Sequence, residues 1–419
     1  MDWFRLVPGM ELDSSPERNL LSPEDRIITR LIRHGVPLLL PKEKVDRQQV
    51  ALVAFAKEGG TSMPELVSAI LPADEDVSEA FKAAKSESAG DSKGPSLREQ
   101  FRESFLWMQW LMFEEEPRVF LRGLARRGLG QRGVCGAVWG QKDIAYRCRT
   151  CENDPTCAIC VPCFQNGNHK DHDYLIMYTG GGCCDCGDAT AWKREGFCSK
   201  HRGVEQIQRL PEEIASSVEP VMDALLLCWR DRLMSAEVAA AEGDSSDADC
   251  DFRELAANEF SSAAIEMLLD FSKYSESLLN FVSKRMLPLV GFLDVLVRAE
   301  RFLPKGVAKK LHELLLKMLG EPSFKYEFAK AFIRYYTLVV KEATKECKDS
   351  VFEKFPLLST FSVQIFTVPT LTPRLVKDLN LLHVMLGCLG DLFQSCAGEE
   401  GYLQVQRNPR TVAASVILV

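Results

Sequence analysis

Closely spaced cysteine and histidine residues dominate the middle of this sequence. They form ordered pairs: Cys148-x2-Cys151, Cys160-x2-Cys163, His169-x2-His172, Cys184-x-Cys186 and Cys198-x2-His201. A gap of two residues lets one tight turn present both side chains to the same ion, and zinc takes four nitrogen or sulfur ligands. Ten of the fifteen cysteines lie between residues 135 and 198, where Cys135, Cys157 and Cys183 stand outside the pairs. The spacing therefore predicts a zinc-binding domain.

The rest of the sequence favours metal over disulfide bonds at these cysteines. The first residues lack the regions of a secretory signal, and no run of roughly 18 uncharged apolar residues predicts a membrane span. We expect a protein of the cytoplasm or nucleus, without a membrane partner, where disulfides are disfavoured. Because the cluster has few large apolar side chains, zinc must replace a hydrophobic core. The scattered cysteines are interpreted as core residues of helices: Cys228, Cys250, Cys347, Cys388 and Cys396.

Spacing and charge argue against a nucleic-acid partner. Seventeen residues separate Cys151 from His169 and two separate His169 from His172, whereas a DNA-reading finger has about twelve and three to five. The whole chain carries a net charge of −8, and residues 133–203 contain eight Lys or Arg against eight Asp or Glu. Nucleic-acid modules are strongly positive. A cationic ligand suits this domain better.

Three aspartates stand among the candidate zinc ligands. In the motif Cys184-Asp185-Cys186-Gly187-Asp188, alternate side chains of an extended backbone face opposite ways, so Asp185 should point away from the metal. Gly187 permits a tight turn that brings Asp188 alongside, and Asp154 lies in a loop between two ligand pairs. These carboxylates could bind an α-ammonium and a guanidinium by charge-assisted hydrogen bonds. The alternative, equally open from the residues alone, is that they cap turns or support the zinc ligands.

The cysteine-rich segment resembles the UBR box of N-recognins, the ubiquitin ligases of the N-degron pathway. The resemblance rests on the segment DPTC, the glycine-rich run before CDCGD, and AWK before the final Cys-x2-His pair, and it covers about 70 residues. The flank LSPEDRIITRLIRHGVP also resembles the start of a plant member of the family. The resemblance implies a mostly α-helical fold that carries a small, irregular domain with three zinc ions.

The family pattern implies which residues hold each zinc ion. One ion would bind Cys148, Cys151, His169 and His172. The other two would share Cys163 and form a binuclear site from Cys135, Cys160, Cys163, Cys184, Cys186, Cys198 and His201, leaving Cys157 and Cys183 as non-ligands. Three zinc ions and eight thiolates bring the charge of residues 133–203 to about −2.

The resemblance also assigns the aspartates to a substrate pocket. Asp154, Asp185 and Asp188 would line a site for a type 1 N-terminus, that is, one beginning with Arg, Lys or His. Thr156 and Ala158 would border it, and Trp139 stands where the family often has phenylalanine. Cys183 replaces a larger apolar residue before CDCGD, but its carbonyl could still accept from the α-ammonium.

The activity implied is that of a RING-type E3 ubiquitin transferase, which would need a ubiquitin-conjugating enzyme as partner. No RING module and no set of catalytic side chains is visible in the sequence. The alternative is a zinc-stabilised helical adaptor that does not bind N-degrons.

Around the zinc domain, apolar residues recur with helical spacing. Ser22 and Pro23 predict a helix start, and Leu311, Leu314, Leu315 and Met318 predict one buried helix face. The expected divisions are an N-terminal helical segment (1–72), a flexible linker (73–95), a helix leading into the box (96–130), the zinc domain (133–203), a helix (205–234), an acidic linker (235–252) and a helical scaffold (253–419). The apolar end, TVAASVILV, predicts a fragment of a longer protein.

Overall fold

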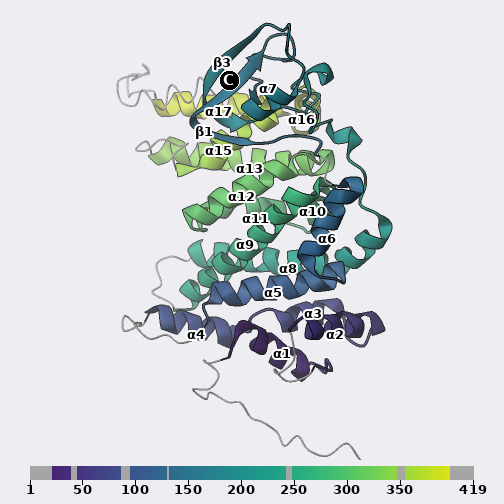
Figure 1. Ribbon diagram of the computed structural model, residues 1–419. Helices are drawn as coiled ribbons and strands as arrows, with labels where there is room; N and C mark the ends of the chain where they lie inside the picture. The colour runs from purple at the N-terminus through teal and green to yellow at the C-terminus, as the bar shows by residue number, and fades with distance from the viewer. Residues whose placement is uncertain are drawn as a thin grey trace, which may run out of the picture.

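The computed structural model describes residues 21–38, 45–85, 95–129, 132–241, 248–346 and 354–396. Helices lie in successive layers, from α1–α4 at one end to α15 and α17 at the other, where the zinc domain lies (Figure 1). One continuous apolar core runs from the first helix to the last. The expectation of a mostly helical scaffold with a small cysteine-rich domain is confirmed. Residues 1–20 of the expected N-terminal helical segment and the apolar end TVAASVILV lie outside the described residues.

The helices before the zinc domain form the first layers of the stack. Their bounds are α1 (Pro23–Arg33), α2 (Val45–Glu58), α3 (Met63–Ile70), α4 (Asp74–Lys85), α5 (Leu97–Phe113), α6 (Pro117–Leu124) and the π-helical turn η2 (Ala125–Leu129). The predicted start at Ser22 is confirmed, because its side chain accepts from the backbone N–H of Asp25 and Pro23 is the first helical residue. A capping box at Ser96 and Glu99 begins α5.

Two predictions in this region were wrong. A flexible linker was expected over 73–95, yet residues 74–85 form α4, while 86–94 lie outside the described residues. Tertiary contacts stabilise α4: Arg26 donates to Asp76 at 2.7 Å, and Val77 is fully buried. The single helix expected over 96–130 is interrupted: α5 ends at Phe113, because Glu114 takes a left-handed conformation, and Pro117 begins α6.

The helix after the zinc domain begins and ends later in the chain than predicted. It was expected over 205–234 and followed by an acidic linker over 235–252, but α8 runs over Glu212–Ala241 and α9 over Ala248–Tyr274. Ala236 and Ala239 are each 1% exposed, so the small residues of this segment pack as helix rather than serving as a spacer. Residues 242–247 lie outside the described part of the chain.

The remaining helices build the end of the stack that meets the zinc domain. They are α10 (Glu276–Met286), α11 (Phe292–Arg298), η5 (Ala299–Arg301), α12 (Lys305–Met318), α13 (Pro322–Glu346), α15 (Pro356–Phe366), α16 (Thr372–Leu379) and α17 (Leu381–Cys396). The predicted apolar face of α12 is confirmed, because Leu311, Leu314, Leu315 and Met318 are all buried. Buried Glu300 accepts from the backbone N–H of Leu357 at 2.9 Å, which fixes the start of α15.

The zinc domain is built around a small antiparallel sheet of order β2-β1-β3. Its elements are β1 (Val138–Cys148), β2 (Ile159–Cys160), α7 (Val161–Asn166), β3 (Tyr174–Cys183), η3 (Arg194–Gly196) and η4 (Val204–Gln206). Strand β1 pairs with β3 from Val138↔Cys183 to Cys148↔Tyr174. The interior consists almost entirely of cysteine side chains with Ile159 and Trp192. This composition agrees with the prediction that metal replaces an apolar core.

Among the described helices, none combines the length and the hydropathy that crossing a bilayer demands.

Candidate zinc centres and binding cavity

The cysteine and histidine side chains of the zinc domain gather into three groups of four. The ligand atoms of each group lie within 4.8 Å of one another. The groups are Cys148, Cys151, His169 and His172; Cys135, Cys160, Cys163 and Cys184; and Cys163, Cys186, Cys198 and His201. These are the three sets that the family pattern implies, and Cys163 belongs to two of them.

The geometry of the groups fits tetrahedral zinc. A Zn–S bond of about 2.3 Å gives an S–S edge of about 3.8 Å in a tetrahedron. The Sγ atoms of Cys135 and Cys160 lie 3.9 Å apart, as do those of Cys163 and Cys198. His201 turns its Nδ1 toward Cys198, 3.0 Å from that Sγ. Three closed N/S sites of this kind are structural rather than catalytic in character.

Several of the ligands lie at the ends of the strands and at the start of the short helix α7. Cys148 ends β1, and Cys160 ends β2 and begins α7, whose first turn carries Cys163. Backbone amides also point at the sulfur atoms: the N–H of Cys160 donates to Cys184 Sγ at 3.2 Å, and that of Cys198 donates to Cys186 Sγ at 3.3 Å. Amide donors of this kind stabilise thiolates.

The two cysteines expected not to bind metal lie outside the three groups. The thiol of Cys157 donates to Asp154 Oδ2 at 3.2 Å, and burial raises the pKa of this thiol well above its ordinary value. Cys183 accepts from Gln364 Nε2 at 3.0 Å, and burial raises its pKa to about 12. Burial therefore favours the protonated thiol at both positions, and Cys157 also uses its proton in the hydrogen bond to Asp154.

Gly187 lies between Asp185 and Asp188 in the sequence and packs closely against Gly133 at the start of the zinc domain. It has a φ of +96°, and an added Cβ would lie 1.9 Å from the carbonyl oxygen of Gly133. The N–H of Asp188 donates to the carbonyl of Asp185 at 3.0 Å, which closes the tight turn predicted from the sequence. Only glycine combines this backbone angle with so close an approach.

Gly187→Ala is expected to lower the stability of the zinc-loaded domain by about 2–4 kcal/mol, because it adds left-handed strain to a backbone clash. Thermal unfolding with parallel zinc analysis measures this loss. The matched control is Gly181→Ala, since Gly181 also has a positive φ but nothing lies within 4 Å of the added Cβ. If both variants lose equal stability, the contact with Gly133 is unimportant.

The first of the three aspartates is fully engaged by its own loop. Asp154 Oδ1 accepts from the backbone N–H of Thr156 at 2.7 Å and from the Thr156 hydroxyl, and its Oδ2 accepts from Cys157. Burial alone would raise the pKa of Asp154, but the hydrogen bonds from Thr156 and Cys157 bring it below its ordinary value. This carboxylate caps a turn, which is the alternative role considered from the sequence.

The other two aspartates each keep one carboxylate oxygen open. Asp185 Oδ2 accepts from the N–H of Ala158 at 2.7 Å, and Asp188 Oδ1 accepts from the N–H and hydroxyl of Thr190. Within the described residues, Asp185 Oδ1 and Asp188 Oδ2 have no hydrogen-bond partner. Burial raises the pKa of Asp185 to about 7, and the carboxylates of Asp188 and Asp154 add to this effect. Asp185 is half-buried rather than fully outward, and it belongs to none of the three metal groups.

The three aspartates line one cavity of about 420 Å³. Trp139, Thr156 and Cys183 line it too, whereas Ala158 is buried outside the lining and donates its backbone N–H to Asp185. The opposite wall comes from the helical scaffold. Its lining residues are Leu316, Ser359, Thr360, Val363, Gln364, Thr367, Val368 and Pro369. Sequence reasoning missed this wall, because no local pattern relates residues nearly two hundred positions apart.

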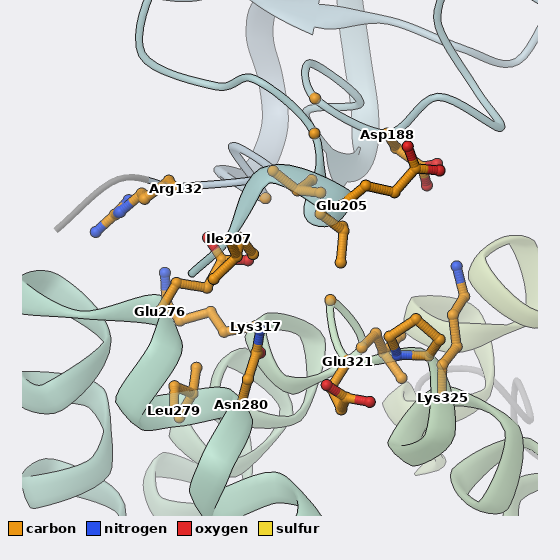
Figure 2. A pocket seen from close by; sticks show the side chains of 18 of the residues that line it. Arg132, Asp188, Glu205, Ile207, Glu276, Leu279, Asn280, Lys317, Glu321 and Lys325 are labelled. Atoms are coloured by element: carbon orange, nitrogen blue, oxygen red, sulfur yellow. The ribbon is translucent and has the colours of Figure 1, made fainter. Parts of the chain in front are cut away.

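The zinc domain is fastened to the scaffold by polar contacts of α10 and its flank. Buried Glu276 accepts from the N–H of Gly133 at 2.7 Å, and Ser277 donates to the carbonyl of Gln208 at 2.6 Å. Burial raises the pKa of Glu276 to about 7, although the Gly133 amide opposes this shift. A second cavity of about 860 Å³ separates the zinc domain from α10, α12 and α13 beside these contacts (Figure 2).

Comparison with known proteins places these features in context. Residues 134–201 match the family described as a putative zinc finger in N-recognin (UBR box). The chain is 54% identical over 398 residues to the E3 ubiquitin-protein ligase PRT6 of Arabidopsis thaliana. The matched segment covers 94% of this chain and 20% of that protein. It is 25% identical over 377 residues to human E3 ubiquitin-protein ligase UBR1, covering 67% of this chain and 21% of that protein. It is 27% identical over 331 residues to E3 ubiquitin-protein ligase Ubr3 of Drosophila melanogaster, covering 67% of this chain and 15% of that protein. The chain spans about a fifth of the length of the first two relatives.

Proposed function

Because this chain belongs to the proteins that carry the N-recognin zinc finger (UBR box), we propose that it binds protein N-termini whose first residue is basic. The bound residue would be Arg, Lys or His, and binding would select the protein for ubiquitination and proteasomal degradation in the N-degron pathway. The observation that carries the proposal is the cavity in which Asp154, Asp185 and Asp188 converge.

The charge of this cavity suits the start of a polypeptide with a basic first residue. Such an N-terminus presents an α-ammonium and a side-chain cation within a few ångströms of each other. The open oxygens of Asp185 and Asp188 can accept from both cations by charge-assisted hydrogen bonds. The carboxylates lie in a partly buried cavity, where such pairs are stronger than at an exposed surface.

The shape of the cavity suits an extended chain end. Trp139 and the glycines 180–182 form one side, and α15 forms the other. A volume of about 420 Å³ is at the small end of the range typical of ligand pockets. It accommodates one long side chain and a short stretch of backbone, so the first residue is the one read most closely.

Ubiquitin transfer is proposed for the longer protein rather than for residues 1–419. Among the described residues, all three groups that could hold a metal belong to the UBR box, and they are closed sites. The relatives, which are about five times longer, are E3 ubiquitin-protein ligases. We therefore infer that this chain supplies substrate recognition, and that a ubiquitin-conjugating enzyme acts through another part of the ligase.

Calorimetric titration of the zinc-loaded chain tests the proposal. Peptides that begin with Arg are expected to bind at low to middling micromolar Kd, about −7 to −8 kcal/mol. Peptides beginning with Lys or His should bind more weakly, and acetylation of the α-amine should abolish binding because it removes one of the two charges that the carboxylates meet.

Peptides beginning with Gly are the matched control for the side-chain charge, and the same titration after chelation controls for the zinc ions. Equal binding of free and acetylated Arg peptides would rule out N-terminal recognition. That result, together with an unchanged partner interaction in Asp185→Asn, would favour the zinc-stabilised adaptor instead.

A further inference from the structure

The scaffold places a cation beside the aspartate cavity. Lys325 lies in the first turn of α13, is half-buried, and lines the larger cavity together with Asp185 and Asp188. Figure 2 shows its side chain extending from the scaffold wall toward the wall that carries Asp188. Lys325 and the two aspartates therefore line one cavity, Lys325 from the scaffold and the aspartates from the zinc domain.

The two cavities are adjacent, because several residues line both of them. They share Cys183, Asp185 and Asp188 from the UBR box, and Leu316, Gln364 and Val368 from the scaffold. A peptide whose first residue occupies the aspartates can therefore extend into the larger cavity. That cavity, at about 860 Å³, has room for the residues that follow.

Most other charges of the larger cavity already have partners. The pairs are Lys284 with Glu321 at 3.2 Å, Arg194 with Glu205, Lys317 with Glu313 at 3.9 Å, Arg374 with Asp378 at 3.4 Å, and Arg132 with the carbonyl of Ser272 at 3.3 Å. Within the described ranges, no carboxylate lies within ion-pair distance of Lys325, and the other unpaired lining cation, Arg209, is exposed. Lys325 is thus a half-buried charge without a counter-ion on its own wall.

We propose that Lys325 is a specificity-determining residue that pairs with an acidic side chain at the second or third position of the bound N-terminus. This inference rests on the proposed function. It makes the preferred substrate a polypeptide that starts with a basic residue and continues with Asp or Glu.

The physical reason is the arrangement of charge on the two walls. A ligand that is only cationic brings its charge close to Lys325, and like charges at short range weaken binding. A carboxylate one or two residues along the ligand reverses that interaction while the first residue keeps its contacts with the aspartates. Side chains of an extended chain alternate in direction, so one of the two positions should face α13 and the other should not.

The experiment compares otherwise identical peptides starting Arg-Ala-Ala, Arg-Glu-Ala, Arg-Ala-Glu and Arg-Lys-Ala on the zinc-loaded full chain. At low ionic strength, one glutamate peptide should bind about fivefold more tightly than Arg-Ala-Ala, a preference that shrinks as salt is added. Lys325→Ala should remove the preference and leave Arg-Ala-Ala binding within about twofold or slightly improved. Lys325→Glu should invert it, so that lysine at that position is favoured.

The matched control is Lys309→Glu on α12, an exposed residue that lines neither cavity. If wild-type protein binds all Arg peptides equally, or if the glutamate preference survives Lys325→Ala, the inference is overturned. It is equally overturned if Lys325→Ala tightens every peptide by the same factor, because Lys325 would then only neutralise the aspartates. Failure of Arg-Ala-Ala to bind at all would instead overturn the proposed function, so the two failures are distinguishable.

Discussion

Replacing Cys163 with serine is expected to release two of the three zinc ions and unfold the UBR box. Cys163 is 2% exposed and belongs to both groups of the binuclear site, whereas every other ligand belongs to one. Structural zinc contributes about 10–16 kcal/mol of apparent binding free energy in zinc-finger peptides. The interior of the box consists mainly of the ligands themselves. Without the bridging thiolate, too little buried apolar surface remains to stabilise the folded box.

The measurement is zinc content per chain, read by a colorimetric chelator, with limited proteolysis of the box and circular dichroism of the whole protein. Cys148→Ser is the comparison for a single site and should lose one ion. Cys157→Ser, outside the three groups, should keep all three. The helical signal should persist in Cys163→Ser, because the scaffold has its own continuous core. A Cys163→Ser protein that retains three zinc ions would contradict the assignment of a shared ligand.

The ligand pairs with a two-residue gap were predictable from the sequence because their information is local, whereas their assembly into three groups came from the family pattern. A two-residue gap fixes both ligands of a pair on one turn, so Cys148 with Cys151 and Cys160 with Cys163 were identified without a fold. The sharing of Cys163 was not derivable from spacing and came from the family pattern. The apolar face of α12 was also predictable, since helical periodicity is a short-range signal.

What the sequence could not predict depends on contacts between distant segments. Composition indicated a linker at residues 74–85, yet burial of Val77 and the contact between Arg26 and Asp76 make it a helix. Gln364 meets Cys183 across 181 positions, and Glu276 meets Gly133 across 143. No periodicity or spacing links such pairs. The aspartates were therefore identified, but the scaffold wall that faces them was not.

The structure distinguishes the three aspartates by the number of carboxylate oxygens that each leaves free for a ligand, which the sequence does not reveal. Asp154 uses both carboxylate oxygens within its own loop, so it holds the shape of the cavity more than it offers free acceptors. Asp185 and Asp188 each contribute one engaged and one open oxygen. A ligand cation should therefore depend most on the charges of these two residues.

Asp185→Asn is expected to weaken binding of an Arg peptide about a hundredfold or more, roughly 3 kcal/mol, because a cation then enters the cavity with one counter-charge fewer. Asparagine retains an oxygen that can accept from the Ala158 amide, so the loop and the zinc content should be preserved. Asp154→Asn should cost only about tenfold, because its charge acts mainly on its own turn. Asp173→Asn, an exposed residue paired with Arg149 outside the cavity, is the control and should bind normally. Calorimetry of the four proteins with one Arg peptide measures the order. If Asp154→Asn proves more damaging than Asp185→Asn with all zinc retained, the open oxygens are not the acceptors, and the first residue must bind nearer to the loop of Thr156.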